Sequence, residues 1–203
     1  MKKISKLVTA LALVLFTGSA FAAPEVGQPA PDFSMTDTNG NQVSLAELKG
    51  KVVVMEWTNH GCPYVKKHYN SENMQALQQQ ALDDDVVWVT VISSAPGKQG
   101  FVDAQEANEI ASEKGASPAH LVLDPEGTLG KRYAARTTPH MFVINKDGDL
   151  AYMGGIDDKP TADRADIEGA NNYVRAALND IQRGTNVSTP TSRPYGCSVK
   201  YAS

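Results

Sequence analysis

The sequence has few of the features that mark membrane, nucleic-acid-binding or disulfide-rich proteins. Cysteine is scarce, because the 203 residues contain only Cys62 and Cys197. The longest hydrophobic run, Leu7–Phe16, is about half of the roughly 20 residues that a membrane-spanning helix needs. Lysine and arginine nowhere form a cluster, and the formal net charge is −4. These absences predict a soluble mature chain with no membrane span, and they argue against nucleic acid or anionic lipid as a partner.

The first 22 residues have the features of an export signal. Lys2, Lys3 and Lys6 accompany the apolar run, and Ala20-Phe21-Ala22 has the small residues of a cleavage site. We therefore predict a signal peptide over 1–22 and a mature chain in the bacterial periplasm, a compartment that permits disulfides. Without the three lysines, the mature chain has 16 basic and 23 acidic residues, a net charge of about −7.

Hydrophobic patterning predicts one α/β domain over residues 23–184. Asn39-Gly40 is a strong hairpin signal, and Lys51–Trp57 is an almost continuous apolar run of the kind that fills a sheet interior. Apolar runs alternate with segments of helical periodicity, which predicts a central mixed sheet with helices on both sides. The expected elements are a hairpin over 33–43, helices over 45–49, 63–82, 101–114 and 166–183, a short helix or turn over 127–134, and strands over 51–57, 86–92, 120–123, 140–144 and 150–153.

Residues 185–203 differ in composition from the domain before them. Thr185–Pro194 is polar and contains two prolines, which predicts a surface tail. Cys197 lies near the end of this tail. Two cysteines in an oxidising compartment can pair, but pairing alone does not distinguish an inert bond from a catalytic one.

The stretch Thr58–Val65, TNHGCPYV, places Cys62 between a predicted strand and a predicted helix. Unpaired backbone N–H groups and the helix dipole favour negative charge at a helix start, so a thiol there is expected to have a lowered pKa. Pro63 supports this placement, since proline is tolerated in the first turn of a helix. These features predict that Cys62 is a nucleophile. A packed free thiol and one end of a passive disulfide are the alternatives.

Several segments together resemble the thioredoxin superfamily, and within it the redoxin branch of exported peroxiredoxin-like proteins. The resemblance rests on GQPAPDFSMTDTNGNQVSLAELKGK, NHGCPYVKKHY, TTPHMFVINKDGDLAYMGGIDDKP and YGCSVKY, which together span almost the whole length of the mature chain. It implies a thioredoxin-like fold with an N-terminal hairpin and a central mixed sheet flanked by helices. It also implies a cis bond at Thr138-Pro139 that faces Cys62, and a Thr138 backbone that holds an extended substrate or an opposing thiol.

The sequence departs from these relatives at the reactive centre. Thioredoxin-type members carry a CxxC pair, but Asn59 stands three residues before Cys62, so a resolving thiol must come from elsewhere. Peroxiredoxins carry a proline at the position of Met55 and a Thr or Ser at the position of Asn59. Both differences weaken a peroxidase assignment. Arg136 resembles the arginine that such enzymes place beside the thiolate.

Cys197 is the internal partner available to Cys62. Attack of Cys62 on a peroxide would give a sulfenic acid, which a second thiol converts to a disulfide. A tail cysteine can deliver that thiol without distorting the core; the alternative is a staple that fastens the tail, worth roughly 5 kcal/mol by loop closure. The predicted catalytic residues are Cys62, Cys197 and Arg136, and the predicted substrate-binding residues are Asn59, His60, Thr138 and Pro139.

His60 and His140 raise a metal-binding alternative. Both are expected near Cys62, where imidazole and thiolate can bind copper or zinc. Two histidines and one cysteine are an incomplete ligand set, so we predict no metal. The sequence implies no organic cofactor. His68, on the helix, is predicted at the surface or half-buried.

The predicted function is that of a periplasmic thiol redox protein. It would reduce peroxide or a disulfide substrate through Cys62, with Cys197 as resolving thiol, and an unidentified periplasmic thiol reductant would regenerate it. A thiol–disulfide oxidoreductase without peroxidase activity and a metal-binding or non-catalytic protein are the alternatives.

Overall fold

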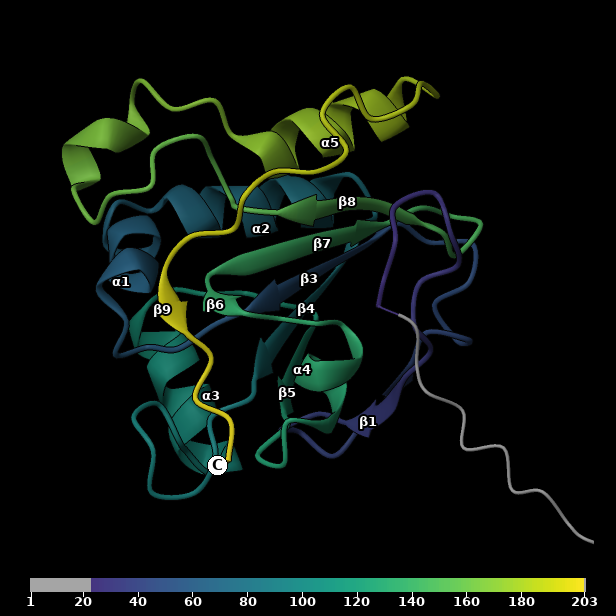
Figure 1. Ribbon diagram of the computed structural model, residues 1–203. Coiled ribbons are helices and arrows are strands. Elements are labelled where there is room, and N and C mark those ends of the chain that lie inside the picture. The colour runs from purple at the N-terminus through teal and green to yellow at the C-terminus, as the bar shows by residue number, and fades with distance from the viewer. Residues whose placement is uncertain (1–22, 203) are drawn as a thin grey trace, which may run out of the picture.

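A computed structural model describes residues 23–202, and the predicted signal peptide over 1–22 lies outside this range. The centre is a five-stranded sheet (Figure 1). The strand order is β5 (His120–Leu123), β4 (Val87–Ile92), β3 (Val53–Trp57), β7 (His140–Ile144) and β8 (Leu150–Gly154). β3 is parallel to β4 and β4 to β5, whereas β7 is antiparallel to β3 and to β8.

β3 is the middle strand because it can bury both of its faces. All five residues are buried; Val53, Met55 and Trp57 pack into the core on one face of the sheet, and Val54 packs into the core on the other. A strand buried on both faces reads as a continuous apolar run, as the sequence does here. The predicted mixed sheet and the thioredoxin-like fold are confirmed.

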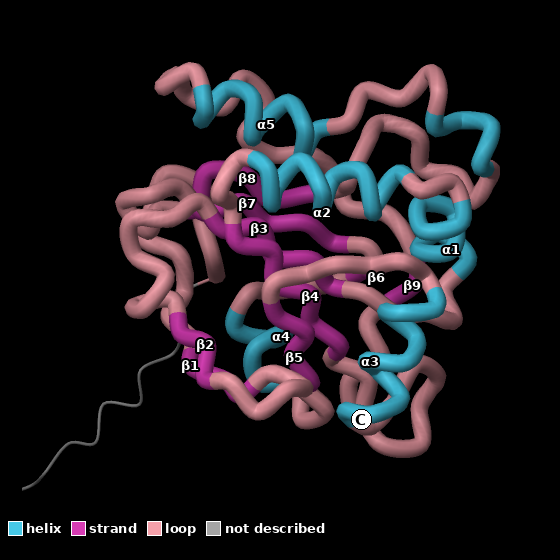
Figure 2. The backbone as a smooth tube through the Cα atoms, turned by 180° about the vertical axis from the view of Figure 1, so that it is seen from behind, coloured by secondary structure: helices cyan, strands magenta, loops and turns pink. Residues whose placement is uncertain are grey.

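Helices cover one face of the sheet. α2 (Asn73–Asp83) and α5 (Tyr173–Gln182) lie side by side in both views (Figures 1 and 2). Their apolar residues pack against Val54, Met141 and Val143. No helix within residues 23–202 is long and apolar enough to cross a membrane.

The opposite face is covered by the N-terminal hairpin, β1 (Ser34–Thr36) with β2 (Gln42–Ser44), and by α4 (Thr128–Arg132). α3 (Ala104–Glu113) lies instead on the face that α2 and α5 cover, where it packs against β4 and β5 through Ile92 and Leu121. The predicted hairpin is therefore present and forms part of the core.

The predicted helix over 63–82 is in fact two helices, α1 (Pro63–Asn70) and α2. Ser71 ends α1, because its hydroxyl donates to the carbonyl oxygens of Lys67 at 2.8 Å and of His68 at 3.3 Å. Glu72 then adopts a left-handed conformation with φ of 58°. The apolar periodicity continues across this break, so the pattern did not reveal it.

Two other predicted helices differ from the structure. The segment over 45–49 is a run of turns that ends at Gly50, whose φ is 88°. The last helix begins at Tyr173 rather than at residue 166, because Asn172 caps it by accepting a hydrogen bond from Arg175 N. A short 3₁₀ turn, η1 (Arg164–Ile167), precedes it.

The segment after α5 is fastened along the body of the protein. In Figure 1 it is the yellow trace that runs from α5 through β9 toward α3. β9 (Cys197–Ser198) pairs antiparallel with β6 (Thr137–Thr138), and Ala95 N donates to Lys200 O at 2.8 Å. The predicted tail is at the surface, but it is docked on partners that lie far away in the sequence.

Candidate active site

Cys62 and Cys197 form a disulfide across a sequence separation of 135 residues, with a Cα–Cα distance of 6.0 Å. Cys62 is the N-cap of α1, and Cys197 is the first residue of β9. The pairing of β9 with β6 sets Cys197 opposite Thr138. The bond therefore joins the helix start that follows the central strand to the C-terminal segment.

The loop before α1 fixes the backbone of Cys62. Its N–H donates to Asn59 O at 3.0 Å, and its carbonyl accepts from Lys66 N at 2.9 Å. Pro63 occupies the first turn of α1, as predicted. The Cys62 sulfur is thus held at a helix start, where unpaired backbone N–H groups favour a negative charge.

Asn59 organises this loop through a buried side chain. Its Oδ1 accepts from Gly61 N at 2.9 Å, and its Nδ2 donates to Gln99 O at 3.1 Å. Gly100 lies so close that a Cβ there would be 2.5 Å from the Asn59 carboxamide. Both ends of the carboxamide have partners within the protein, so contact between Asn59 and a substrate stays a prediction.

The peptide bond Thr138–Pro139 is cis and faces Cys62, as the resemblance implies. Cys62 Sγ lies 3.2 Å from Thr138 O. Gly196 packs on the same carbonyl, and a Cβ at Gly196 would lie 2.1 Å from Thr138 O. In this structure the Thr138 backbone holds an opposing cysteine, Cys197, because glycine at position 196 permits the close approach.

The two cysteines differ in accessibility. Cys62 is 0% exposed, whereas Cys197 is half-buried. A thiol arriving from solvent therefore reaches Cys197 first. Attack at Cys197 would release Cys62 as a thiolate at the helix start.

Arg136 and His140 flank this region. Arg136 is exposed, and its carbonyl accepts from Val199 N at 3.0 Å, so its backbone anchors the tail. His140 is buried, and its Nδ1 accepts from Arg136 N at 3.3 Å. Burial, and secondly the charge of Arg136, lower the pKa of His140 to about 3. The action of the Arg136 guanidinium on the Cys62 sulfur stays a prediction.

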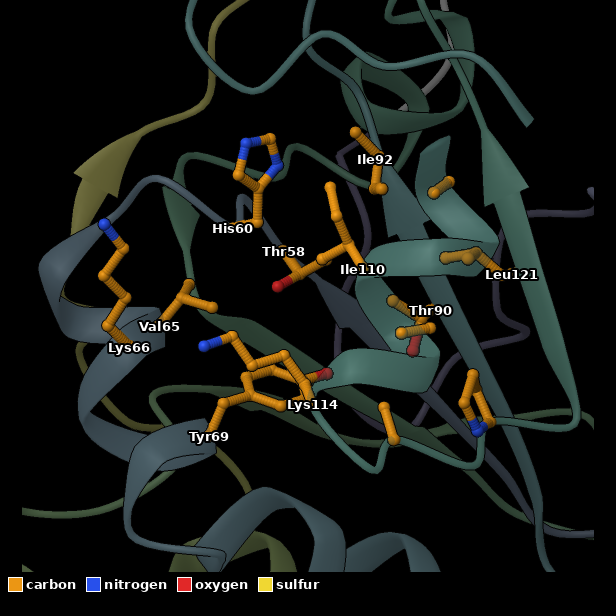
Figure 3. A pocket seen from close by; sticks show the side chains of 14 residues that line it. Thr58, His60, Val65, Lys66, Tyr69, Thr90, Ile92, Ile110, Lys114 and Leu121 are labelled. Atoms are coloured by element: carbon orange, nitrogen blue, oxygen red, sulfur yellow. The ribbon is translucent and has the colours of Figure 1, made fainter. Parts of the chain in front are cut away.

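A pocket lies beside the Cys62 loop, between α1 and α3 (Figure 3). His60 stands at its rim, Val65 and Ile110 line its apolar wall, and Tyr69 and Lys114 also line it. His60 Nδ1 is buried and has no hydrogen-bond partner among the described residues. The pocket therefore places His60 at a cavity next to the Cys62 loop, where its predicted contact with substrate would occur.

Sequence reasoning missed a buried carboxylate on the central strand. Glu56 accepts hydrogen bonds from Tyr69 Oη at 2.9 Å, Trp88 Nε1 at 3.1 Å and Thr90 Oγ1 at 3.2 Å. Burial raises the pKa of Glu56, and these hydrogen bonds oppose the rise. The one signal in the sequence was an acidic residue inside the apolar run VVVMEW.

The metal-binding alternative receives no support from the geometry. Within residues 23–202, no group of three or more His, Cys, Asp or Glu side chains is arranged to hold a metal ion. The sulfur of Cys62 forms a disulfide with Cys197, and Nδ1 of His140 accepts a hydrogen bond from a backbone N–H.

The chain is similar to known proteins over most of its length. A family profile described as Redoxin matches residues 25–170. The thiol-disulfide oxidoreductase ResA of Bacillus subtilis is 27% identical over 147 residues, which cover 71% of this chain and 76% of that protein. The sporulation thiol-disulfide oxidoreductase A of the same organism is 30% identical over 139 residues, 66% of this chain and 77% of that one.

Solved structures share the fold. An uncharacterized conserved protein from Geobacillus kaustophilus superposes with a TM-score of 0.74 and 24% identity, covering 91% of this chain and 94% of that one. The residues that match the Redoxin profile include Cys62 and Thr138 but stop before Cys197.

Proposed function

Because the chain belongs to the redoxin family, we propose that it is a thiol–disulfide oxidoreductase whose Cys62 and Cys197 alternate between a dithiol and a disulfide. The observation that carries the proposal is the bond itself, which joins a buried sulfur at a helix start to a more accessible one on a docked strand. The names of the Bacillus subtilis relatives support the same chemistry. The alternating states require one reductive and one oxidative half-reaction.

In the reductive half-reaction, a thiol donor returns the protein to its dithiol form. The donor thiolate attacks the Cys197 sulfur, the Cys62–Cys197 bond breaks, and Cys62 leaves as a thiolate that the helix start stabilises. A second donor thiolate then attacks the donor sulfur of the mixed disulfide and releases Cys197. The donor pair loses two electrons and becomes a disulfide, and the protein gains them.

In the oxidative half-reaction, the Cys62 thiolate attacks a substrate disulfide and displaces one substrate thiolate. Cys197 then attacks the Cys62 sulfur of the mixed disulfide and displaces the second substrate thiolate. The substrate leaves as a dithiol, and the protein disulfide is restored. Renewed pairing of β9 with β6 would bring Cys197 back to Cys62 for this second attack.

Peroxide is a second candidate substrate, and the docked tail favours it. The Thr138 edge, where an extended peptide would bind, is already paired with β9. A protein substrate therefore has to displace the tail, whereas a peroxide does not. The Cys62 thiolate would attack one peroxide oxygen, the O–O bond would break to release water or an alcohol, and the sulfenic acid would condense with Cys197 to give the disulfide and water. Arg136 is the proposed electrostatic aid to the first step.

The proposed compartment is the periplasm. The signal-like residues 1–22 support export, and disulfides persist in an oxidising compartment. The reductant would then be a thiol protein of the same compartment.

Intact-mass analysis of the reduced protein tests both substrates. Wild type, Cys62→Ser and Cys197→Ser each receive one equivalent of a model disulfide or of hydrogen peroxide. We expect the wild type to form the internal disulfide with either oxidant. We expect Cys197→Ser to accumulate a mixed disulfide with the first oxidant and a sulfenic acid with the second, and Cys62→Ser to do neither.

The possible outcomes separate the two substrates. If Cys197→Ser gives the mixed disulfide but no sulfenic acid, peroxide is not a substrate and disulfide exchange stands. If Cys62 reacts with neither oxidant at one equivalent, the bond is a structural staple and the proposed function is wrong.

A further inference from the structure

A buried cluster of polar and charged side chains lies between α1 and the C-terminal segment. Lys67 and His68 of α1 are 1% and 0% exposed, so the prediction that His68 lies at the surface or half-buried is wrong. Asp157, from the loop after β8, is also buried, and the hydroxyl of Tyr195 donates to its Oδ1. Helical periodicity could not place these residues, because segments far away in the sequence cover them.

The hydrogen bonds of the cluster have one consistent direction. Asn73 Nδ2 donates to His68 Nδ1 at 2.8 Å, which leaves the ring proton on Nε2. Nε2 then donates to Tyr195 Oη at 3.1 Å, and Tyr195 donates to Asp157. Burial, and secondly the charge of Lys67, lower the pKa of His68 to about 3, so the ring is neutral near pH 7.

Lys67 supplies the charge that balances Asp157. Its Nζ lies 3.7 Å from Asp157 Oδ2 and donates to Lys159 O at 2.8 Å. The same ammonium stands 5.7 Å from the centre of the Tyr195 ring. Removing one partner of a buried ion pair leaves an uncompensated charge, so the cluster depends on all of its members.

We propose that Lys67, His68, Asp157 and Tyr195, here called the clamp, are positioning residues that hold Cys197 against Cys62 in the dithiol form. Tyr195 is two residues before Cys197, and Lys67 is five residues after Cys62, so the clamp joins the two segments that carry the sulfurs. This inference rests on the proposed function, because it concerns the state in which the disulfide is open.

The clamp raises the effective concentration of the Cys197 thiol at Cys62. A free segment samples many positions, whereas a docked segment keeps its thiol within reach of the partner sulfur, which favours the disulfide. Loss of the clamp therefore lowers the equilibrium constant for disulfide formation and makes the bond easier to reduce. A cluster with a merely structural role would destabilise the oxidised and reduced proteins equally and leave this constant unchanged.

Equilibration of the full chain with a glutathione redox buffer tests the clamp. Tyr195→Phe removes the hydroxyl and keeps the ring, and we expect it to lower the equilibrium constant at least fivefold, which raises the reduction potential by about 20 mV. Asp157→Asn should shift the constant in the same direction. Tyr64→Phe is the matched control, because its ring faces Tyr195 at 5.9 Å and the substitution leaves the ion pair intact. We expect the control to stay within twofold of the wild type.

Urea unfolding of the oxidised and reduced forms provides a second readout that a folding defect cannot imitate. The clamp predicts that Tyr195→Phe loses more unfolding free energy in the oxidised form than in the reduced form, by the free energy that corresponds to the change in equilibrium constant. If the wild-type disulfide exchanges freely with glutathione and both clamp variants have equilibrium constants within twofold of the wild type, the clamp proposal is wrong and the proposed function stands. If the wild-type disulfide does not exchange at all, the proposed function fails, and the clamp fails with it.

Discussion

At the scale of the residue, the surroundings of His140 favour the neutral form of its imidazole ring. Its Nδ1 accepts a backbone hydrogen bond from Arg136, and its ring lies 4.5 Å from that of Phe142. A proton on Nδ1 would remove that bond and place a charge in an apolar setting. The folded protein therefore keeps His140 neutral, as it does His68 within the clamp.

We predict that mild acid weakens the fold through these two histidines. Between their folded pKa of about 3 and the ordinary value of 6.5, the unfolded chain binds protons that the folded chain does not. Stability is therefore complete above pH 6.5 and falls as the pH decreases below it. Each histidine should remove about 2 kcal/mol between pH 6.5 and pH 5.

Urea unfolding of the wild type and of His140→Gln at these two pH values measures the effect. The variant should lose about 2 kcal/mol less than the wild type on acidification, because glutamine does not titrate. The comparison uses the change with pH, so any loss of packing at position 140 cancels. An identical pH dependence in the two proteins would show that His140 is not held neutral.

At the scale of the element, the approach of β9 to β6 depends on Gly196. Its φ is 135°, a conformation that other residues rarely adopt, and a Cβ there would meet the Thr138 carbonyl. The strand pairing that brings Cys197 to Cys62 therefore requires glycine at this position. The local sequence YGC contains the requirement, but only the structure shows which carbonyl imposes it.

We predict that Gly196→Ala separates β9 from β6. The substitution should cost about 1 to 3 kcal/mol of unfolding free energy and should slow formation of the disulfide from the reduced protein. Gly169→Ala is the control, since a Cβ there meets no atom within 4 Å and its φ is not positive. Equal rates of disulfide formation in the two variants would contradict the role given to Gly196.

The strands were more predictable from the sequence than the helix boundaries. Val53–Trp57 and His140–Ile144 are buried on both faces and read directly as apolar runs. The end of α1 depends on the Ser71 hydroxyl, and the start of α5 on the Asn172 cap. Such side chain to backbone hydrogen bonds interrupt or begin a helix without changing the apolar periodicity around them.

At the scale of the whole molecule, the candidate active site combines two parts of the chain that differ in how well the sequence predicted them. The residues that match the Redoxin profile supply Cys62 and the Thr138–Pro139 turn. The local sequence predicted Cys62 at a helix start, and the family resemblance implied that the Thr138–Pro139 bond is cis and faces it. The C-terminal segment supplies Cys197, and its polar, proline-containing composition predicted a surface position without the docking. The docking depends on contacts such as Tyr195 with Asp157, which no local pattern encodes.

A redox titration of the oxidised wild type tests the central claim, that the Cys62–Cys197 bond is redox-active, most directly. The folded protein is equilibrated in a series of thiol–disulfide buffers, quenched with acid and alkylated. Its intact mass is then measured by mass spectrometry. We predict one reversible two-electron transition, in which both cysteines become open to alkylation together. Its midpoint should lie above about −300 mV, because structural disulfides of secreted proteins typically have reduction potentials below that value. A bond that stays oxidised below about −300 mV, or that opens only when the protein unfolds, would contradict the claim.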